Sequence, residues 1–127
     1  MTTVREVMSS ELVTVDPSVT VMEAARVMAT AGIGSALVVD GDRVQGIFTE
    51  RDILRALAHH SDADAGRVSS VAAWMTRDPV TIGPDATVGE AMDRMLDGGF
   101  RHLPVMGGET IAGIVSMRDL ARSISKG

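Results

Sequence analysis

The stretch GIFTERD, from Gly46 to Asp52, returns 67 positions later as GIVSMRD, from Gly113 to Asp119. Both copies end a run of apolar residues with a hydroxyl and a carboxylate three positions apart. Such a pair is typical of a helix N-terminus, where the two side chains satisfy unpaired main-chain amides. A ligand site explains the same spacing, because amides at a helix N-terminus favour phosphate and a carboxylate can accept hydrogen bonds from a sugar diol.

The repetition extends far beyond this stretch. Residues 8–55 align with residues 75–122 without a gap, and 17 of the 48 aligned positions are identical. The glycine and isoleucine before each hydroxyl are kept, which allows a close approach of the backbone at this point and favours a ligand site. A repeat of this kind indicates two copies of one structural unit.

Each copy predicts the same order of elements, β-α-β-β-α. Capping boxes mark the start of the first helix, and glycine turns between β-branched runs mark a hairpin. In the first and second copies respectively, the expected elements are an extended segment at 13–15 and 80–82, a helix capped by Thr20 and Glu23 or by Thr87 and Glu90, a hairpin turning at 40–42 or 107–108, and a closing helix from Thr49 or Ser116.

The expected fold class is therefore α+β. One copy of about 55 residues buries little apolar surface by itself, so the two copies are expected to pack their sheets together as a pseudo-twofold pair with a central ligand cleft. The predicted boundaries are 4–59 for the first repeat, 60–68 for a polar linker and 69–125 for the second repeat, with residues 1–127 forming a single module.

Composition excludes several classes of protein. The formal net charge of −5 argues against a nucleic-acid binder, and an aromatic content of 2% provides no platform for stacking bases. There is no cysteine, which excludes disulfides and thiolate metal sites. Since no apolar run is long enough for a signal peptide or a membrane span, a cytoplasmic protein without membrane contact is expected.

Catalytic and metal chemistry find little support in the sequence. No nucleophile is placed beside a base, so we expect no enzyme activity and no catalytic residues. His59, His60, Asp62 and Asp64 cluster in the predicted linker, but their spacing fits no fixed ligand frame. We therefore expect neither a metal site nor a required cofactor. Trp74 is expected to anchor the core or an interface rather than stack on a ligand.

The duplicated unit resembles the cystathionine β-synthase (CBS) domain, and the pair resembles a stand-alone Bateman module. The resemblance rests on V-x-E-A-x-x-x-M in the first helix of each copy, on FRHLPV at 100–105 and on the two GIFTERD-like stretches. It implies tandem CBS repeats with adenosine-containing ligands in the cleft between them. AMP, ADP or ATP are the ligands expected first, and S-adenosylmethionine or NAD-type molecules are the alternatives.

The resemblance also implies two sets of binding residues. Ser116 and Asp119 would form one site and Thr49 and Asp52 the other, with the hydroxyl on ribose or phosphate and the carboxylate on the ribose hydroxyls. Arg101 matches a basic residue that meets phosphates. The remaining implied contacts, which cross from the opposite copy, are Gly34, Ser35 and Ala36 at the Asp119 site, His102 and Leu103 at the Asp52 site, and Val13 and Val80 from the short first strands.

The two sites are expected to differ. Arg101 aligns with Gly34, so the Asp52 site lacks the arginine that could bind phosphate through charge-assisted hydrogen bonds. The sequence therefore predicts that the Asp119 site binds phosphate-bearing ligands better. Arg51 and Arg118 are also repeat partners, and either a solvated helix position or a ligand contact explains them.

The resemblance implies a regulatory role, in which a bound adenine nucleotide shifts the population of two states. A homodimer is expected through the helices that begin near Val21, Glu50, Val88 and Met117, with an effector protein acting in trans. The alternative is a structural or protein-interaction dimer module that keeps the fold and binds no nucleotide.

Overall fold

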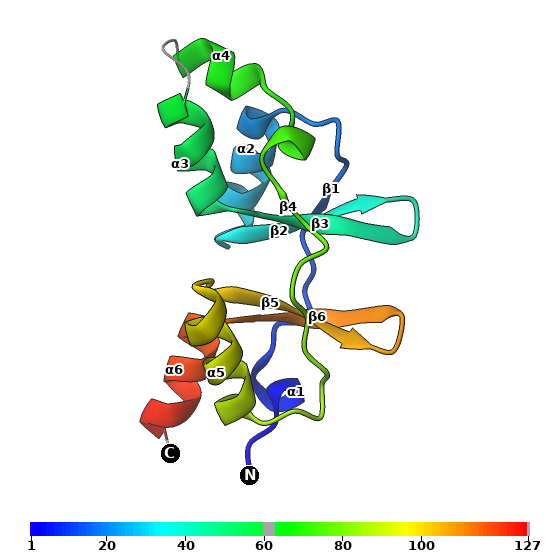
Figure 1. The fold of residues 1–127 in the computed structure, drawn as a ribbon, viewed down its shortest axis with the longest axis vertical. Coiled ribbons are helices and arrows are strands. Elements are labelled where there is room, and N and C mark those ends of the chain that lie inside the picture. The colour runs from blue at the N-terminus through cyan, green and yellow to red at the C-terminus, as the bar shows by residue number, and fades with distance from the viewer. Residues whose placement is uncertain (60–62, 127) are drawn as a thin grey trace. The chain divides into compact units, whose positions relative to one another are not determined.

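The computed structural model describes residues 1–59 and 63–126 and shows an α+β chain with two similar compact units. The Thr49 unit consists of Val13–Asp78, and the Ser116 unit joins Met1–Leu12 to Pro79–Gly127. The predicted helices and hairpins follow one another along the chain in both copies (Figure 1). The expectation of an α+β fold built from two copies of one motif is confirmed.

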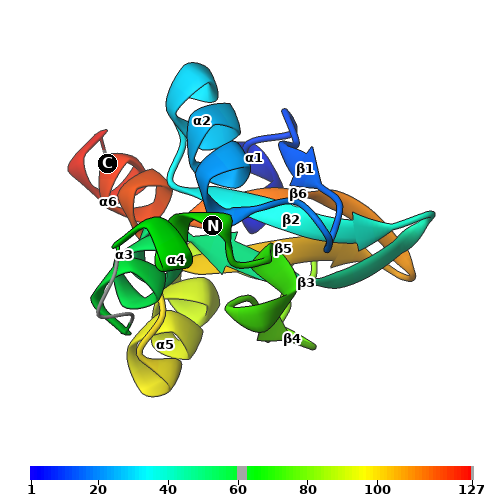
Figure 2. The ribbon, with the colours of Figure 1, turned by 90° about the horizontal axis from the view of Figure 1, so that it is seen from above.

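The Thr49 unit is organised around one four-stranded sheet with the strand order β1-β2-β3-β4. The strands are β1 (Thr14–Val15), β2 (Ser35–Asp40), β3 (Arg43–Thr49) and β4 (Thr76–Arg77). β1 runs parallel to β2, whereas β3 is antiparallel to both of its neighbours. Figure 2 shows β1 and β4 along opposite edges of the β2–β3 hairpin.

Helices cover one face of this sheet (Figure 1). They are α2 (Val21–Ala31), α3 (Glu50–His59), α4 (Ala63–Val68) and the short 3₁₀ helix η1 (Val71–Ala73). The predicted N-cap of α2 is present, since the Glu23 amide donates to Thr20 Oγ1 over 3.1 Å and the Thr20 hydroxyl lies 3.2 Å from the Glu23 carboxylate. The helix ends at Gly32, whose φ of 70° is in the left-handed region that glycine adopts without strain.

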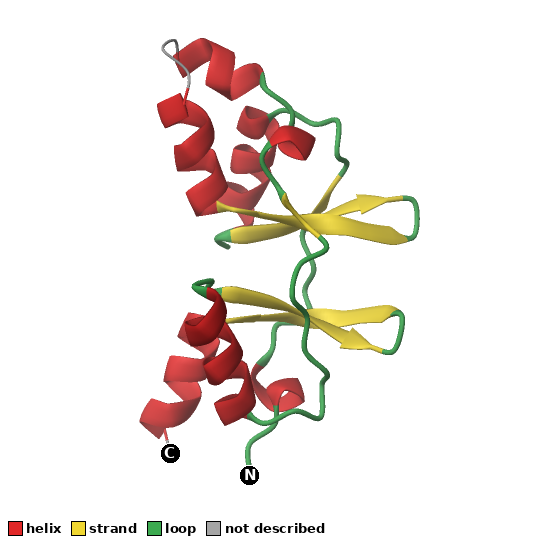
Figure 3. Ribbon diagram, viewed as in Figure 1, coloured by secondary structure: helices red, strands yellow, loops and turns green. Residues whose placement is uncertain are grey.

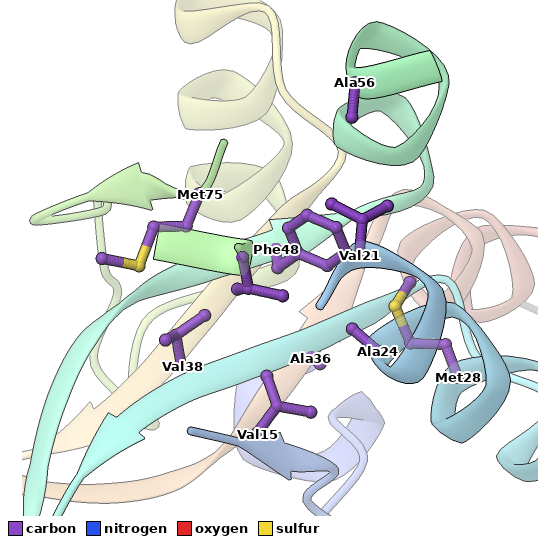
Figure 4. Packing of buried hydrophobic residues seen from close by; sticks show 10 residues of the cluster. Val15, Val21, Ala24, Met28, Ala36, Val38, Phe48, Ala56 and Met75 are labelled. Atoms are coloured by element: carbon purple, nitrogen blue, oxygen red, sulfur yellow. The ribbon is translucent and has the colours of Figure 1, made fainter. Parts of the chain in front are cut away.

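The core of the Thr49 unit lies between α2 and the sheet. Phe48 on β3 is fully buried and, as Figure 4 shows, its ring lies beside Val21 of α2, with Ala24 and Met28 following along the same helix face. Met75 completes this cluster from the other side. The helical stripe predicted from the sequence is thus the face that packs on the sheet.

Among the described residues, the Ser116 unit repeats the arrangement with fewer strands, since its sheet is a two-stranded hairpin and the predicted extended segment at 80–82 contributes only an isolated bridge between Ile82 and Val105. Its elements are α1 (Val4–Val7), α5 (Val88–Gly98), β5 (His102–Gly107), β6 (Thr110–Ser116) and α6 (Met117–Lys126). Figure 3 shows the turn of each hairpin at the end of the strands away from the helix that follows. Gly41 and Gly108 adopt φ angles of 63° and 71° in these turns, which confirms the predicted hairpins.

Each unit is completed by a segment that precedes the extended segment of the other sequence copy. Residues 1–12 complete the Ser116 unit, and residues 69–78 complete the Thr49 unit. Val4 is fully buried in the core of the Ser116 unit, and Val71 is fully buried in that of the Thr49 unit. The main chain of Ser9 pairs with Ile114 on β6, as β4 pairs with β3. The boundaries 4–59 and 69–125 stay a prediction for the sequence repeats, and packing groups the residues differently, as 1–12 with 79–127 and as 13–78.

This exchange explains why the glycine of each GIFTERD-like stretch is kept. A Cβ on Gly113 would lie 2.5 Å from the carbonyl oxygen of Ser9, and a Cβ on Gly46 would collide with the carbonyl oxygen of Thr76. The approaching backbone belongs to the segment that completes each unit, which contains Ser9 in the Ser116 unit and Thr76 in the Thr49 unit. Only glycine leaves room for it.

The predicted linker contains a helix. Residues 63–68 form α4, and a Cβ on Gly66 would lie 2.6 Å from the Ala56 carbonyl oxygen, so α4 packs closely on α3. Residues 60–62 of the predicted linker lie outside the described residues. No helix within 1–59 or 63–126 has both the length and the apolar character that a membrane span requires.

Candidate functional site

Thr49 and Asp52 meet where β3 passes into α3. The Thr49 amide donates to Asp52 Oδ2 over 2.9 Å, and the Thr49 hydroxyl lies 3.3 Å from the same oxygen. Arg55 Nη1 lies 3.2 Å from Asp52 Oδ1. Asp52 is only 3% exposed, and both of its oxygens are engaged within the unit.

Ser116 and Asp119 form the matching pair where β6 passes into α6, but their bonding differs. The Ser116 amide donates to Asp119 Oδ2 over 2.8 Å, and the Asp119 amide donates back to Ser116 Oγ over 3.1 Å. Among the described residues, Asp119 Oδ1 accepts no hydrogen bond. Both pairs are therefore helix caps, and only the Asp119 carboxylate keeps an oxygen available for a further donor.

Arg101 lies beside the Ser116 end of its unit. Its carbonyl accepts a hydrogen bond of 2.8 Å from the Met117 amide, the first residue of α6. His102 follows directly and pairs with Ser116 across β5 and β6. The Arg101 side chain is exposed, so its guanidinium can approach an anion near the start of α6.

Gly34 occupies the equivalent place in the Thr49 unit. Its carbonyl accepts a hydrogen bond of 3.1 Å from the Glu50 amide, as Arg101 does from Met117. A Cβ on Gly34 would lie 3.2 Å from the Glu50 carboxylate, which therefore covers this glycine. The Thr49 end has a carboxylate where the Ser116 end has an apolar Met117 and an arginine.

The other predicted site residues divide between the units. Gly34, Ser35 and Ala36 lie with Thr49, since Ser35 pairs with Thr49 across β2 and β3. Leu103 belongs to the core of the Ser116 unit. Val13 is half-buried and offers its carbonyl to Leu37, and Val80 is 49% exposed. The implied crossing of these groups to the opposite copy stays a prediction.

A pocket that the sequence did not reveal opens in the Ser116 unit. Its volume is about 420 Å³, and its walls come from α1 with the residues before it and from the first turns of α6. We call it the α1–α6 pocket. The lining residues are Thr2, Glu6, Val7, Asp119, Arg122 and Ser123.

In the Thr49 unit, Trp74 connects several of the residues around Asp52. The indole N–H donates to Ser69 Oγ over 3.0 Å, and the Arg55 guanidinium carbon lies 5.8 Å from the ring centroid. His59 meets the ring edge-on, with the ring centroids 5.4 Å apart. Trp74 is thus a structural anchor, which agrees with its expected role.

The histidines and acids of the predicted linker divide between described and undescribed residues. His59 ends α3 and Asp64 lies in α4, whereas His60 and Asp62 fall outside the described residues. Within the described part of the chain, no three His, Cys, Asp or Glu side chains gather closely enough to hold a metal ion.

Relatives of known sequence match almost the whole of this chain. The chain is 42% identical over 125 residues to an uncharacterized 17.7 kDa protein of Acidianus ambivalens, covering 97% of this chain and 73% of that protein. It is 35% identical over 127 residues to the CBS domain-containing protein CBSCBSPB3 of Arabidopsis thaliana, which covers 98% of this chain but only 22% of that protein. The chain thus spans less than a quarter of this plant relative.

Solved structures agree with the fold. The CBS-domain containing protein ATU1752 from Agrobacterium tumefaciens superposes with a TM-score of 0.91 at 35% identity, covering 97% of this chain and 93% of that one. The CBS domain pair of protein MJ0100, in complex with 5′-methylthioadenosine and S-adenosyl-L-methionine, gives a TM-score of 0.86 at 26% identity and covers 99% and 98%. The CBS domain family model matches residues 4–59 and 68–126. The chain therefore belongs to the CBS domain family and carries two copies of the domain in tandem.

Proposed function

We propose that this chain is a regulatory module that binds adenosine-containing ligands, with AMP, ADP or ATP as the first candidates. The observation that carries the proposal is the pair of Ser116 and Asp119, which leaves Asp119 Oδ1 without a hydrogen bond among the described residues. The structure of MJ0100 with methylthioadenosine and S-adenosylmethionine supports this ligand class for the family.

Three groups at the start of α6 carry the binding. Asp119 Oδ1 accepts hydrogen bonds from a ribose diol, and the helix N-terminus favours negative charge nearby. The guanidinium of Arg101 reaches the phosphates, and its charge-assisted hydrogen bonds favour nucleotides over nucleosides. The further contacts around the adenine are the ones that the family resemblance implies, from Gly34, Ser35, Ala36 and Val80.

In this proposal, the Thr49 end binds a ligand that carries a positive charge, whereas the Ser116 end binds phosphate. Glu50 covers Gly34, so phosphate meets a carboxylate at the place where the Ser116 end has Arg101. A cationic group, such as the sulfonium of S-adenosylmethionine, is compatible with this carboxylate. Because Asp52 is already bonded to Thr49 and Arg55, a ligand must displace one of them. His102, Leu103 and Val13 complete this end as the resemblance implies.

A thermal-shift panel tests the proposal on ligand-stripped protein. AMP, ADP, ATP, S-adenosylmethionine and NAD are compared, and a ligand at about 100 times its dissociation constant adds roughly 2.7 kcal/mol, a shift of several degrees. Asp119→Ala should remove more of the shift than Asp52→Ala, and Arg101→Ala should reduce the shift by ATP more than that by S-adenosylmethionine.

Thr87→Ala is the matched control for the loss of a helix cap. Thr87 Oγ1 accepts the Glu90 main-chain amide over 3.1 Å at the start of α5, and Thr87 does not belong to the proposed site. This variant should lower the melting temperature and leave the ligand-induced shift unchanged. If no ligand at millimolar concentration moves the melting temperature of the wild type, the proposal fails.

A second candidate is an interaction dimer that needs no ligand. One large apolar side chain is exposed on each of α2, α3, α5 and α6, namely Val27, Leu54, Leu96 and Ile124, with exposed fractions of 43%, 68%, 66% and 63%. These are the helices through which a homodimer is expected. Light scattering after size exclusion should show a dimer that Leu54→Asp together with Ile124→Asp converts to a monomer, whereas a monomeric wild type removes this candidate.

A further inference from the structure

The α1–α6 pocket has a filled counterpart in the same chain. Val7, in its wall, is the repeat partner of Trp74, since the two positions are 67 residues apart. Its other lining residues have repeat partners around Trp74 as well, with Thr2 matching Ser69 and Arg122 matching Arg55. The Thr49 unit therefore shows what the pocket looks like when an aromatic ring occupies it.

The two frameworks are equivalent in their main-chain hydrogen bonds. In both units, main-chain hydrogen bonds join the segment before Met8 or Met75 to the start of a helix, α5 or α2, and to the turn before that helix. The bonds in the Ser116 unit are Val88 N to Thr2 O (3.1 Å), Val4 N to Ala86 O (2.8 Å) and Arg5 N to Pro84 O (2.9 Å), and those in the Thr49 unit are Val21 N to Ser69 O (2.9 Å), Val71 N to Val19 O (2.9 Å) and Ala72 N to Pro17 O (3.1 Å).

In the Thr49 unit, a hydroxyl and a guanidinium contact the Trp74 ring. A hydroxyl, Ser69 Oγ, accepts the ring N–H over 3.0 Å. A guanidinium, that of Arg55, lies over the ring with its carbon 5.8 Å from the centroid. Such a contact is favourable because the face of an aromatic ring attracts a cation.

The α1–α6 pocket offers the same two groups without the ring. Thr2 provides the hydroxyl in place of Ser69, and Arg122 provides the guanidinium in place of Arg55. Arg122 forms none of the ion pairs found among the described residues, whereas Arg55 is bound to Asp52. Two further polar groups line the pocket where the Thr49 unit has alanines, because Glu6 matches Ala73 and Ser123 matches Ala56.

We infer that the α1–α6 pocket binds a flat bicyclic aromatic ring that carries an N–H group, of the purine or indole class. The ring takes the place that Trp74 fills in the Thr49 unit, with its face toward Arg122 and its N–H toward Thr2. The Glu6 carboxylate and the Ser123 hydroxyl accept hydrogen bonds from an additional amino group, which favours an aminopurine over indole. The volume of about 420 Å³ lies in the range of small-molecule pockets, roughly 300–1,000 Å³.

This site is separate from the proposed nucleotide site except for Asp119, which lines the pocket and caps α6. Arg101 and Ser116 do not line the pocket, and Thr2, Val7 and Arg122 are not among the nucleotide contacts proposed above. The two proposals can therefore fail independently of one another.

The test uses the full chain, labelled on its valine methyl groups, and titrates free adenine and free indole as separate probes. Both should shift the Val7 methyl resonances, with a dissociation constant of about 1 mM or below for the better probe. Adenine binding tighter than indole assigns the pocket to the purine class, and the reverse order assigns it to the indole class. If neither probe shifts Val7 at about 10 mM, the inference is wrong.

Val7→Trp places an indole where the Thr49 unit has one. It should abolish binding of both probes, followed on the remaining valine methyls of the unit, and raise the melting temperature because the pocket is filled. Val68→Trp, at an exposed position of α4, is the control that adds an indole elsewhere and should change neither probe's affinity. If Val7→Trp is folded and still binds the probes as the wild type does, the pocket is not the site.

Two milder variants keep the inference testable if Val7→Trp does not fold. Arg122→Leu removes the cation over the ring and should weaken probe binding about two- to fivefold. Arg101→Ala should leave probe binding unchanged while reducing the ATP-induced thermal shift. If Arg122→Leu leaves the affinity for the ring unchanged, the arrangement seen around Trp74 is not used in the Ser116 unit and the inference is overturned.

Discussion

Arg55 approaches Asp52 to 3.2 Å, and this ion pair has no counterpart between Arg122 and Asp119 among the described residues. Arg55 and Arg122 are repeat partners, so the surroundings of Asp52 can be compared directly with those of Asp119. One carboxylate is almost completely buried and bonded on both oxygens, whereas the other is half-buried and bonded on one. The same motif therefore serves mainly stability in one unit and leaves an acceptor available in the other.

Arg55→Ala should lower the free energy of unfolding by about 1–3 kcal/mol. The substitution leaves the buried Asp52 carboxylate with one oxygen unpaired, and an unsatisfied buried acceptor is costly. Arg122→Ala, at the equivalent position, should cost less than about 0.5 kcal/mol because it breaks no ion pair found in the described ranges. Urea unfolding of both variants measures the difference, and equal losses would contradict the assigned role of the pair.

Gly66→Ala should destabilise the chain by about 1–3 kcal/mol. The added methyl would lie 2.6 Å from the main-chain oxygen of Ala56, so α4 must move away from α3. Gly89→Ala is the matched control, since its Cβ meets only Thr87 Oγ1 at 3.8 Å in the first turn of α5. That variant should gain about 0.5–1 kcal/mol, because alanine loses less backbone entropy than glycine. Thermal or urea unfolding distinguishes the two signs.

Gly113→Ala tests the exchanged N-terminal segment. A methyl at this position would lie 2.5 Å from the Ser9 carbonyl oxygen, so the pairing of Ser9 with Ile114 must loosen. Hydrogen exchange of the Ser9 and Ile114 amides should become faster, as each donates to the other's carbonyl over 2.9 Å in the wild type. Gly83→Ala, whose Cβ would meet nothing within 4 Å, should leave both exchange rates unchanged.

The pKa of Asp16 should be lower than its ordinary value. The Ser18 hydroxyl donates to Asp16 Oδ1 over 2.7 Å, and the Ser18 amide donates to the same oxygen over 2.9 Å, and both favour the ionised carboxylate. The folded state thus has the lower pKa, so its stability contribution is present above the ordinary pKa and is lost as the pH falls through the folded value. An NMR titration should show the pKa of Asp16 rising toward its ordinary value in Ser18→Ala, and an unchanged pKa would contradict this assignment.

The elements of the fold could be predicted because the sequence marks each boundary with local chemistry. Thr20 and Thr87 cap the first helices, Gly32 ends α2, and glycines make both hairpin turns. α4 was not predicted, because ADAGRV has too short a run of apolar residues to show helical periodicity. Its stability depends on Gly66 packing against α3, which is a tertiary property.

The pairs in the candidate site were predictable from their repetition, but their surroundings were not. Glu50 contacts Gly34 only because the strand start and the helix start meet in space. Comparing Val7 with Trp74 would have shown one large difference in size between repeat partners. An alignment does not say which unit each segment packs against, so the pocket beside Val7 could not be located from the sequence.

The exchange of N-terminal segments has a consequence for how the chain folds. Neither sequence copy contains its whole core, because Val4 and Val71 each complete the other unit. Contacts such as Val4 with Ala86 join residues more than eighty positions apart, which raises the contact order and slows folding. Fragments 1–61 and 62–127 should each be largely unstructured alone and regain helical circular dichroism when mixed. Because each half of the sequence supplies part of the core of the other unit, the two halves should fold as one cooperative system, and deletion of either half should leave the other without a complete core.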